Sequence, residues 1–153
     1  MIRKTVIILA ALAATTTSSW AMDQEQAEKV LEYRQGLMPV ILWNIMPMAG
    51  MAKDRVPYDA EKFQLHAERV AYAGTMIVEM FRPDTSDAVL ETEALDEIWE
   101  DFETFADLAV ESQEKSAALA KIAAGGDFAA VQAGFLEMGQ GCKACHDKFR
   151  EEN

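Results

Sequence analysis

The sequence predicts an all-α protein, an up-down-up-down four-helix bundle. Four segments place apolar residues three and four positions apart, which is the spacing of one helix face. No segment has the pattern of a strand, and most joints between the four segments are short. Helices of similar length with short connections pack as antiparallel neighbours, and this arrangement is the bundle.

A leader precedes the first helix. It starts with Arg3 and Lys4, continues with the ten-residue apolar run TVIILAALAA, and ends in small residues up to Ala21. The apolar run is too short to cross a bilayer, so a secretory signal peptide is expected. Cleavage after Ala21 removes residues 1–21 and leaves 22–153 as one domain, which we expect in a bacterial periplasm.

The first predicted helix covers about residues 24–52. Its stretch 37–52, LMPVILWNIMPMAGMA, is uncharged and contains Pro39 and Pro47, which makes it a poor membrane span. A proline inside a helix removes a hydrogen bond and crowds the carbonyl four residues back, so a kink or local break is expected at each. Because the stretch is apolar all round, one side should face the core and the other a second subunit or a cofactor edge.

The second helix is expected to run from Asp59, a candidate N-cap, to Phe81. His66 lies at the border of its apolar stripe and is expected to be a boundary or solvent-facing residue. A loop follows, over about 83–93. The third helix then carries apolar residues spaced by threes and fours, apart from a gap that two serines fill: Leu95, Ile98, Phe102, Phe105, Ala109, Ser112, Ser116 and Leu119.

The fourth helix has the most regular pattern. Gly125 and Gly126 end the helix before it, and Asp127 is its candidate N-cap. Its marker residues are separated by gaps of three and four throughout: Phe128, Val131, Phe135, Met138, Cys142, Cys145 and Phe149.

The negative net charge of the chain argues against two classes of binding partner. The formal net charge is −12 for the whole chain, and removal of the leader with its two basic residues makes it −14. So acidic a surface argues against binding nucleic acid or a membrane of anionic lipid.

Both cysteines and one of the two histidines lie in a stretch of five residues, 142–146, near the end of the fourth predicted helix. The surrounding sequence is GCKACHDK. C-x-x-C-H is the attachment signature of a c-type haem. Residues three and four apart share one side of a helix. Cys142 and Cys145 can therefore form thioether bonds with the two vinyl groups of one haem, and His146 can bind the iron of that haem. One covalently bound haem c per chain is therefore expected on the C-terminal helix.

Other uses of these residues fit less well. A disulfide between Cys142 and Cys145 would close a very small loop and constrain the unfolded chain little. A thioredoxin-like dithiol needs a βαβ context, which the sequence lacks. A zinc site needs four ligands, and only distant His66 could complete the set. A bundle whose cysteines carry no haem, and which is colourless, remains the third alternative.

The chain resembles the cytochrome c′ family over essentially its whole exported length. The motif GCKACHDKFR carries most of the resemblance, and the segments EYRQ, PYDA, IWEDFETF and AAGGD occur in the family's order. The resemblance implies an up-and-down bundle that binds nitric oxide and carbon monoxide, can transfer one electron to or from an unidentified redox partner, and turns over no organic substrate. It also implies a homodimer built on the first two helices.

The resemblance assigns further residues. His146 would be the only strong iron ligand, and Met38 would close the opposite, distal side of five-coordinate iron. Arg34 would lie beside the haem propionates, and Arg150 near the proximal face. Pro39, directly after Met38, departs from the family pattern.

The role of Met38 separates two functions. A thioether can pack in an apolar pocket, as in a gas-binding cytochrome c′, or it can ligate the iron. In the second case the protein would be a six-coordinate, low-spin electron carrier that resembles cytochromes c-556. Packing is the preferred interpretation, because the pattern YRQ before the methionine favours the c′ group.

Overall fold

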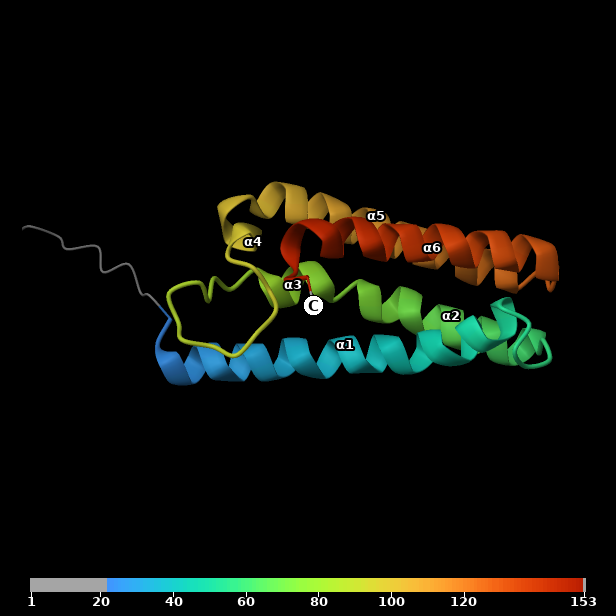
Figure 1. Ribbon diagram of the computed structural model, residues 1–153, viewed down its shortest axis with the longest axis horizontal. Helices are drawn as coiled ribbons and strands as arrows, with labels where there is room; N and C mark the ends of the chain where they lie inside the picture. The colour runs from blue at the N-terminus through green and yellow to red at the C-terminus, as the bar shows by residue number, and fades with distance from the viewer. Residues whose placement is uncertain (1–21, 153) are drawn as a thin grey trace, which may run out of the picture.

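The computed structural model describes residues 22–152, so the predicted signal peptide of residues 1–21 lies outside the described residues. The helices run up and down along one axis (Figure 1). Their bounds are α1 Gln24–Ala52, α2 Ala60–Gly74, α3 Ile77–Phe81, α4 Glu97–Glu100, α5 Phe102–Ala123 and α6 Phe128–Phe149. The predicted up-down-up-down bundle is confirmed, with α2 and α3 together forming its second column.

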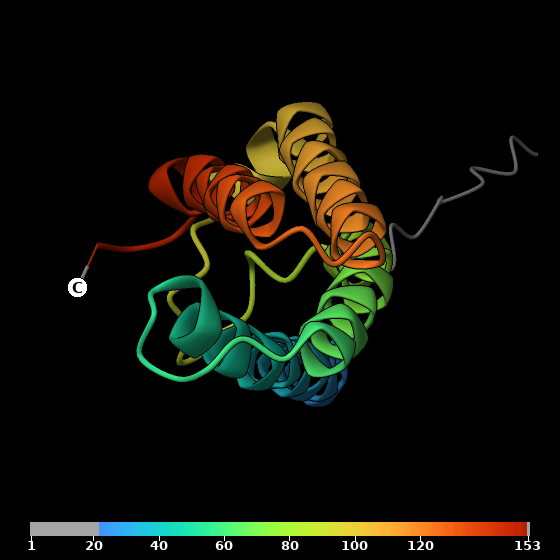
Figure 2. The ribbon, with the colours of Figure 1, turned by 90° about the vertical axis from the view of Figure 1, so that its right-hand side faces the viewer.

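The four columns do not contact one another equally. The pairs α1–α2, α2–α5 and α5–α6 pack along their lengths, whereas α1 and α6 share only a few contacts. Viewed along the bundle, α1 and α6 stand apart on one side while the other neighbours are adjacent (Figure 2). The bundle is therefore most open between its first and last helices.

The second and third predicted helices are both divided. A tight turn separates α2 from α3. In this turn the backbone N–H groups of Thr75 and Met76 each donate to the carbonyl three residues earlier. Gly74 ends α2 where α5 comes close, since a Cβ there would lie 3.3 Å from Gln113 Cγ. Asp101 divides α4 from α5, because its side chain caps a new helix by accepting from the Thr104 N–H.

The expected breaks at the two prolines of α1 are absent. The helix is uninterrupted from Gln24 to Ala52, with Pro39 and Pro47 inside it. The carbonyls that lose their partners belong to Gln35 and Trp43, and both residues are exposed. Water can therefore hydrate these carbonyls, and the helix tolerates the loss of two hydrogen bonds.

No helix among residues 22–152 is long and apolar enough to span a membrane. The uncharged stretch of α1 was the candidate, and it remains too short.

Two apolar clusters fill the bundle. The larger lies between α1, α2, α5 and α6 and includes Phe63, Leu119 and Val131. The smaller lies at the other end, and we call it the aromatic cluster: Phe81, Ile98, Phe105 and Phe149. Its rings pack edge to face or tilted, for example Phe105 against Phe149 at 5.4 Å between centroids.

Two glycines of α6 permit its close approach to α5. A Cβ on Gly134 would lie 3.0 Å from Ile122 Cδ1, at the flexible end of a side chain. A Cβ on Gly141 would lie 3.2 Å from the backbone Cα of Ser112 and 3.0 Å from Lys115 Cδ. Glycine at 141 is therefore what lets the two helices meet at the level of the first cysteine.

The long connection 82–96 holds both ends of the described chain. The Gln24 side-chain amide donates to the Val89 carbonyl and accepts from the Val89 N–H, at 2.9 and 3.2 Å. At the other end, Leu95 N–H donates to Phe149 O, and Glu151 N–H donates to Glu93 O. The connection thus spans the bundle from the start of α1 to the end of α6.

A polar pair joins α1 to α2 inside this otherwise apolar packing. Asn44 is buried, and its amide donates to the Val40 carbonyl at 2.8 Å. Its oxygen lies 2.9 Å from Nδ1 of half-buried His66. The oxygen can only accept, so Nδ1 carries the proton of the neutral imidazole. Burial, aided by Arg69, lowers the pKa of His66.

Substitution of Gly141 by alanine is expected to destabilise the protein. Overpacking against the Ser112 backbone costs about 1–3 kcal/mol, which exceeds the about 0.5–1 kcal/mol that alanine gains over glycine inside a helix. Gly36→Ala is the control, because Gly36 has no neighbour within 4 Å. Denaturant unfolding of both variants checks this, and equal stability of the two would contradict it.

The Asn44–His66 pair predicts a pH dependence. Burial and Arg69 hold the folded-state pKa of His66 below that of the unfolded chain, so the stability that comes with a neutral imidazole is complete above about pH 6.5. It is lost as the pH falls through the lowered pKa. Between about pH 7 and 5, the parent should lose more unfolding free energy than His66→Gln, which keeps a donor for Asn44 without titrating. Parallel pH profiles of the two proteins would contradict this.

Candidate haem-attachment site

The last two turns of α6 bring the predicted cofactor residues together. Asp127 caps the start of this helix by accepting from the Ala129 N–H, and the contacts of Gly141 fix its other half against α5. Cys142 and Cys145 are half-buried and carry free thiols, while His146 is exposed. Two thiols one turn apart with an imidazole beside them match the geometry that C-x-x-C-H requires.

The two thiols have different surroundings. Cys145 packs against the aromatic cluster. Burial, with a smaller contribution from Cys142, raises the pKa of the Cys145 thiol to about 11. Cys142 lies on the α5 side, where its Sγ is 3.6 Å from the Ser112 hydroxyl oxygen.

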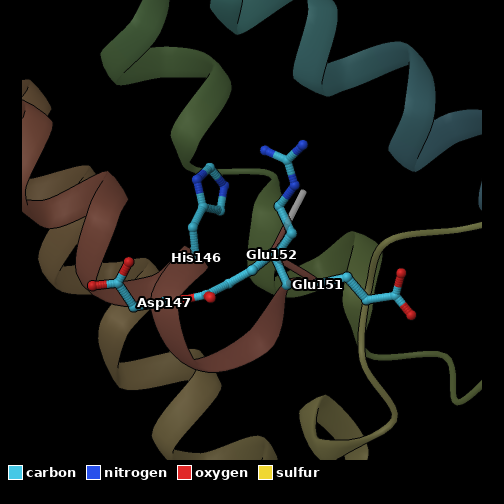
Figure 3. Close-up of a pocket in the computed structure, with 5 residues that line it drawn as sticks. His146, Asp147, Glu151 and Glu152 are labelled. Carbon is cyan, nitrogen blue, oxygen red and sulfur yellow. The ribbon is translucent and has the colours of Figure 1, made fainter.

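The His146 ring points from α6 toward the side on which α1 and α3 run, and Asp147 points away from it (Figure 3). A shallow hollow around it is lined by His146, Asp147, Arg150, Glu151 and Glu152. Desolvation and then the positive charge of Arg150 lower the pKa of His146, while Asp147 opposes them. A neutral imidazole is the form that binds a metal ion.

Met38 approaches the same region from α1. It is half-buried and packs against the aromatic cluster, as Cys145 does from α6. The cluster therefore links the predicted distal residue to the attachment motif across the open side of the bundle.

The residues present fit a haem. Gly139 lies two turns before His146 on its side of α6, and a Cβ there would meet nothing within 4 Å. Open space thus remains beside Gly139, on the side of α6 that carries His146. Among residues 22–152 no cluster of side chains suits a bare metal ion, so the cysteines are better explained by haem attachment than by zinc.

Arg34 is a buried cation held by neutral groups. Its side chain donates to Met80 O at 3.0 Å, Pro83 O at 2.6 Å and Thr85 Oγ1 at 2.8 Å. Burial lowers its pKa to about 10, although Asp84 acts in the opposite direction. Within residues 22–152 no carboxylate lies at ion-pair distance, so two of its five N–H groups remain for an anion.

The aromatic side chains around Arg34 complete its surroundings. The guanidinium carbon lies 4.6 Å from the centroid of Phe81 and 5.1 Å from that of Trp99. The Trp99 indole N–H donates to the carbonyls of Phe81 and Pro83. Arg34 and Trp99 together therefore hold the turn that follows α3.

Arg150 is exposed one turn beyond His146, and its backbone N–H donates to the His146 carbonyl. Its Nε donates to Glu93 Oε2 at 2.7 Å, so the side chain is drawn toward the connection 82–96.

The structure thus gathers Cys142, Cys145 and His146 on α6, with Arg150 as its C-cap, and brings Met38 to the cluster beside them. Arg34 lies one turn before Met38, although its guanidinium bonds the turn after α3. The sequence did not assign a role at the site to Ser112 or Glu93. Only Ser112 left a signal, because it interrupts the apolar spacing of the third predicted helix.

Comparisons with known proteins agree with this geometry. The family model for Cytochrome C' matches residues 29–150. Cytochrome c-554 of Cereibacter sphaeroides is 35% identical over 86% of this chain and 99% of its own. Cytochrome c' of Halomonas halodenitrificans is 33% identical over 83% of this chain and 99% of its own.

Solved structures match as well. Cytochrome c prime from Shewanella frigidimarina superposes with a TM-score of 0.77 at 32% identity, covering 85% of this chain and all of that one. A nitric oxide complex of a mutant cytochrome c prime from Alcaligenes xylosoxidans gives 0.75 at 28% identity, covering 83% and 97%. With the C-x-x-C-H motif on the last helix of the same bundle, these matches show that the chain belongs to the cytochrome c′ family of c-type haem proteins.

Proposed function

We propose that this chain is a periplasmic cytochrome that binds nitric oxide or carbon monoxide and can carry one electron. Its haem c is attached through Cys142 and Cys145, with His146 as the single strong iron ligand. The observation that carries the proposal is that α6 presents C-x-x-C-H while the hydrophobic side chain that α1 packs against the same cluster is Met38. When bound, haem iron supplies a position for a diatomic ligand and one-electron redox chemistry.

His146 is assigned the proximal position. Its lowered pKa keeps the imidazole neutral near neutral pH. Its exposure leaves the ring available to bind the iron. Arg150 lines the same hollow and places a positive charge near this proximal side.

Met38 is assigned a packing role on the distal side. Its side chain packs against the aromatic cluster, a favourable environment for a thioether that fills an apolar gap. An apolar side chain on the distal side disfavours water there and favours small uncharged molecules at the sixth iron position. Solved relatives in complex with nitric oxide support the same ligand class here.

The second candidate is a six-coordinate electron carrier in which Met38 ligates the iron. The observation that favours it is the position of a thioether, a known haem ligand, in the same cluster as Cys145. Both candidates predict electron transfer and no turnover of an organic substrate.

Arg34 is assigned to the haem propionates. It is a buried cation, 4% exposed, with two N–H groups to spare and only carbonyl and hydroxyl partners. A carboxylate of the cofactor would complete its bonding with a charge-assisted pair.

A homodimer is proposed through α1 and α2. Trp43 is 75% exposed, and Tyr33, Val40, Leu65 and Tyr72 are large apolar residues exposed on the same two helices. A groove between these helices is lined in part by Val40, Leu65 and Tyr72, which suits side chains of a second copy.

The dimer is tested by placing a charge on that surface. Trp43→Glu should shift the equilibrium toward monomer in sedimentation experiments, because a carboxylate would be desolvated at the contact. Val89→Glu is the control, since Val89 is exposed on the connection 82–96. A parent protein that sediments as a monomer would contradict the proposal, and so would equal effects of the two variants.

The coordination is tested by the visible absorption spectrum of the reduced, haem-loaded protein with and without carbon monoxide. A broad, unsplit high-spin band that shifts on addition of carbon monoxide is expected for five-coordinate iron with Met38 packed. Sharp, split bands that do not respond would show that Met38 ligates the iron and would establish the second candidate. A colourless protein would exclude both.

Met38→Ala should open the distal side and raise the carbon monoxide association rate at least several-fold. Met46→Ala is the matched control, because Met46 is exposed on the same helix and belongs to neither apolar cluster. If both variants bind at the parent rate, Met38 does not limit ligand entry.

A further inference from the structure

The gap in the apolar pattern of α5 lies against the attachment motif. Ser112 and Ser116 occupy positions where the spacing calls for apolar side chains. Ser112 is half-buried, and its hydroxyl oxygen lies 3.6 Å from Cys142 Sγ, within the range of hydrogen bonds to sulfur. An apolar residue here would leave that sulfur without a polar contact from α5.

The backbone fixes this contact from both sides. Gly141 comes so close that its Cβ would be 3.2 Å from Ser112 Cα, and it immediately precedes Cys142. On α5, the buried Ser116 hydroxyl donates to the Ser112 carbonyl at 2.9 Å. Ser116 therefore bonds its own helix, and only Ser112 reaches across to the cysteine.

Attachment of the cofactor would decide the direction of the hydrogen bond. In the free thiol, either the Ser112 hydroxyl or the Cys142 thiol can donate. A thioether sulfur has no proton, so it can only accept. We propose that Ser112 is a positioning residue for the haem, whose hydroxyl donates to the thioether sulfur of Cys142. The inference rests on the proposed haem attachment and adds a residue to that site.

The contact would make the two attachment points unequal. The Cys142 sulfur is held by a donor from α5, whereas Cys145 packs against the aromatic cluster. A donor fixes the rotation of the Cys142 side chain and hence one edge of the haem. It also withdraws electron density from the sulfur, and hydrogen bonds near a redox centre tune its reduction potential. Loss of the donor should therefore favour the oxidised state.

The test compares haem-loaded Ser112→Ala, Ser112→Thr and Ser116→Ala with the parent. Reduction potentials are measured by optical titration, and the mass of each denatured chain shows whether haem is attached. Ser112→Ala should lower the potential, and Ser112→Thr, which keeps the hydroxyl, should restore it. Ser116→Ala removes a neighbouring buried hydroxyl without touching the cysteine, so its potential should equal that of the parent.

A merely structural role would lower stability in both alanine variants without separating their potentials. Equal potentials in Ser112→Ala and the parent, or equal shifts in the two alanine variants, would overturn the inference. The parent alone gives a second measurement: the C–S stretching band of the Cys142 thioether should shift in D₂O, where the serine donates a deuteron. An unshifted band would also overturn it. A parent chain without attached haem would instead overturn the proposed function, and this inference with it.

Discussion

The close packing of α5 against α6 is the contact on which the rest of the arrangement depends. Gly134 and Gly141 let the helices approach, and the second of them sets the level of the attachment motif relative to Ser112. Because α5 also packs along α2, and α2 along α1, the position of the first helix follows from this contact through two further interfaces. The remaining side, between α1 and α6, is left with few contacts and with the motif beside it. The bundle thus concentrates its packing on three sides and leaves the fourth, between α1 and α6, more open.

Arg34 shows how the fold holds a charge where packing alone would exclude one. Three neutral acceptors and two aromatic faces surround the guanidinium, and hydrogen bonds to charged groups contribute about 1.5–3 kcal/mol each. Desolvation opposes them, as the lowered pKa shows. The balance ties α1 to the turn after α3 next to the aromatic cluster, so the residue serves both the fold and the proposed propionate contact.

Much of this could be predicted from the sequence, because the deciding signals are local. The bounds of the first and last helices, the Asp127 cap and the spacing of Cys142, Cys145 and His146 all follow from neighbours within a few turns. The close approach of Gln113 to Gly74, where α2 ends, could not be predicted, since Gln113 belongs to another helix. The continuity of α1 through Pro39 and Pro47 likewise depends on which carbonyls face water. The partners of Arg34 are 46 to 51 residues distant, and spacing patterns carry no information at that range.

The connection 82–96 gives the bundle a property that its helices alone would lack. It is bonded to Gln24 at the start of α1, to Phe149 at the end of α6, and to Glu151 just beyond it. Chain ends usually fray independently, because little holds them. Here the start of α1 and the end of α6 are bonded to one connection, so an opening of the connection would release both of them together. Residues far apart in the sequence therefore share part of their stability at the end of the bundle that contains the aromatic cluster.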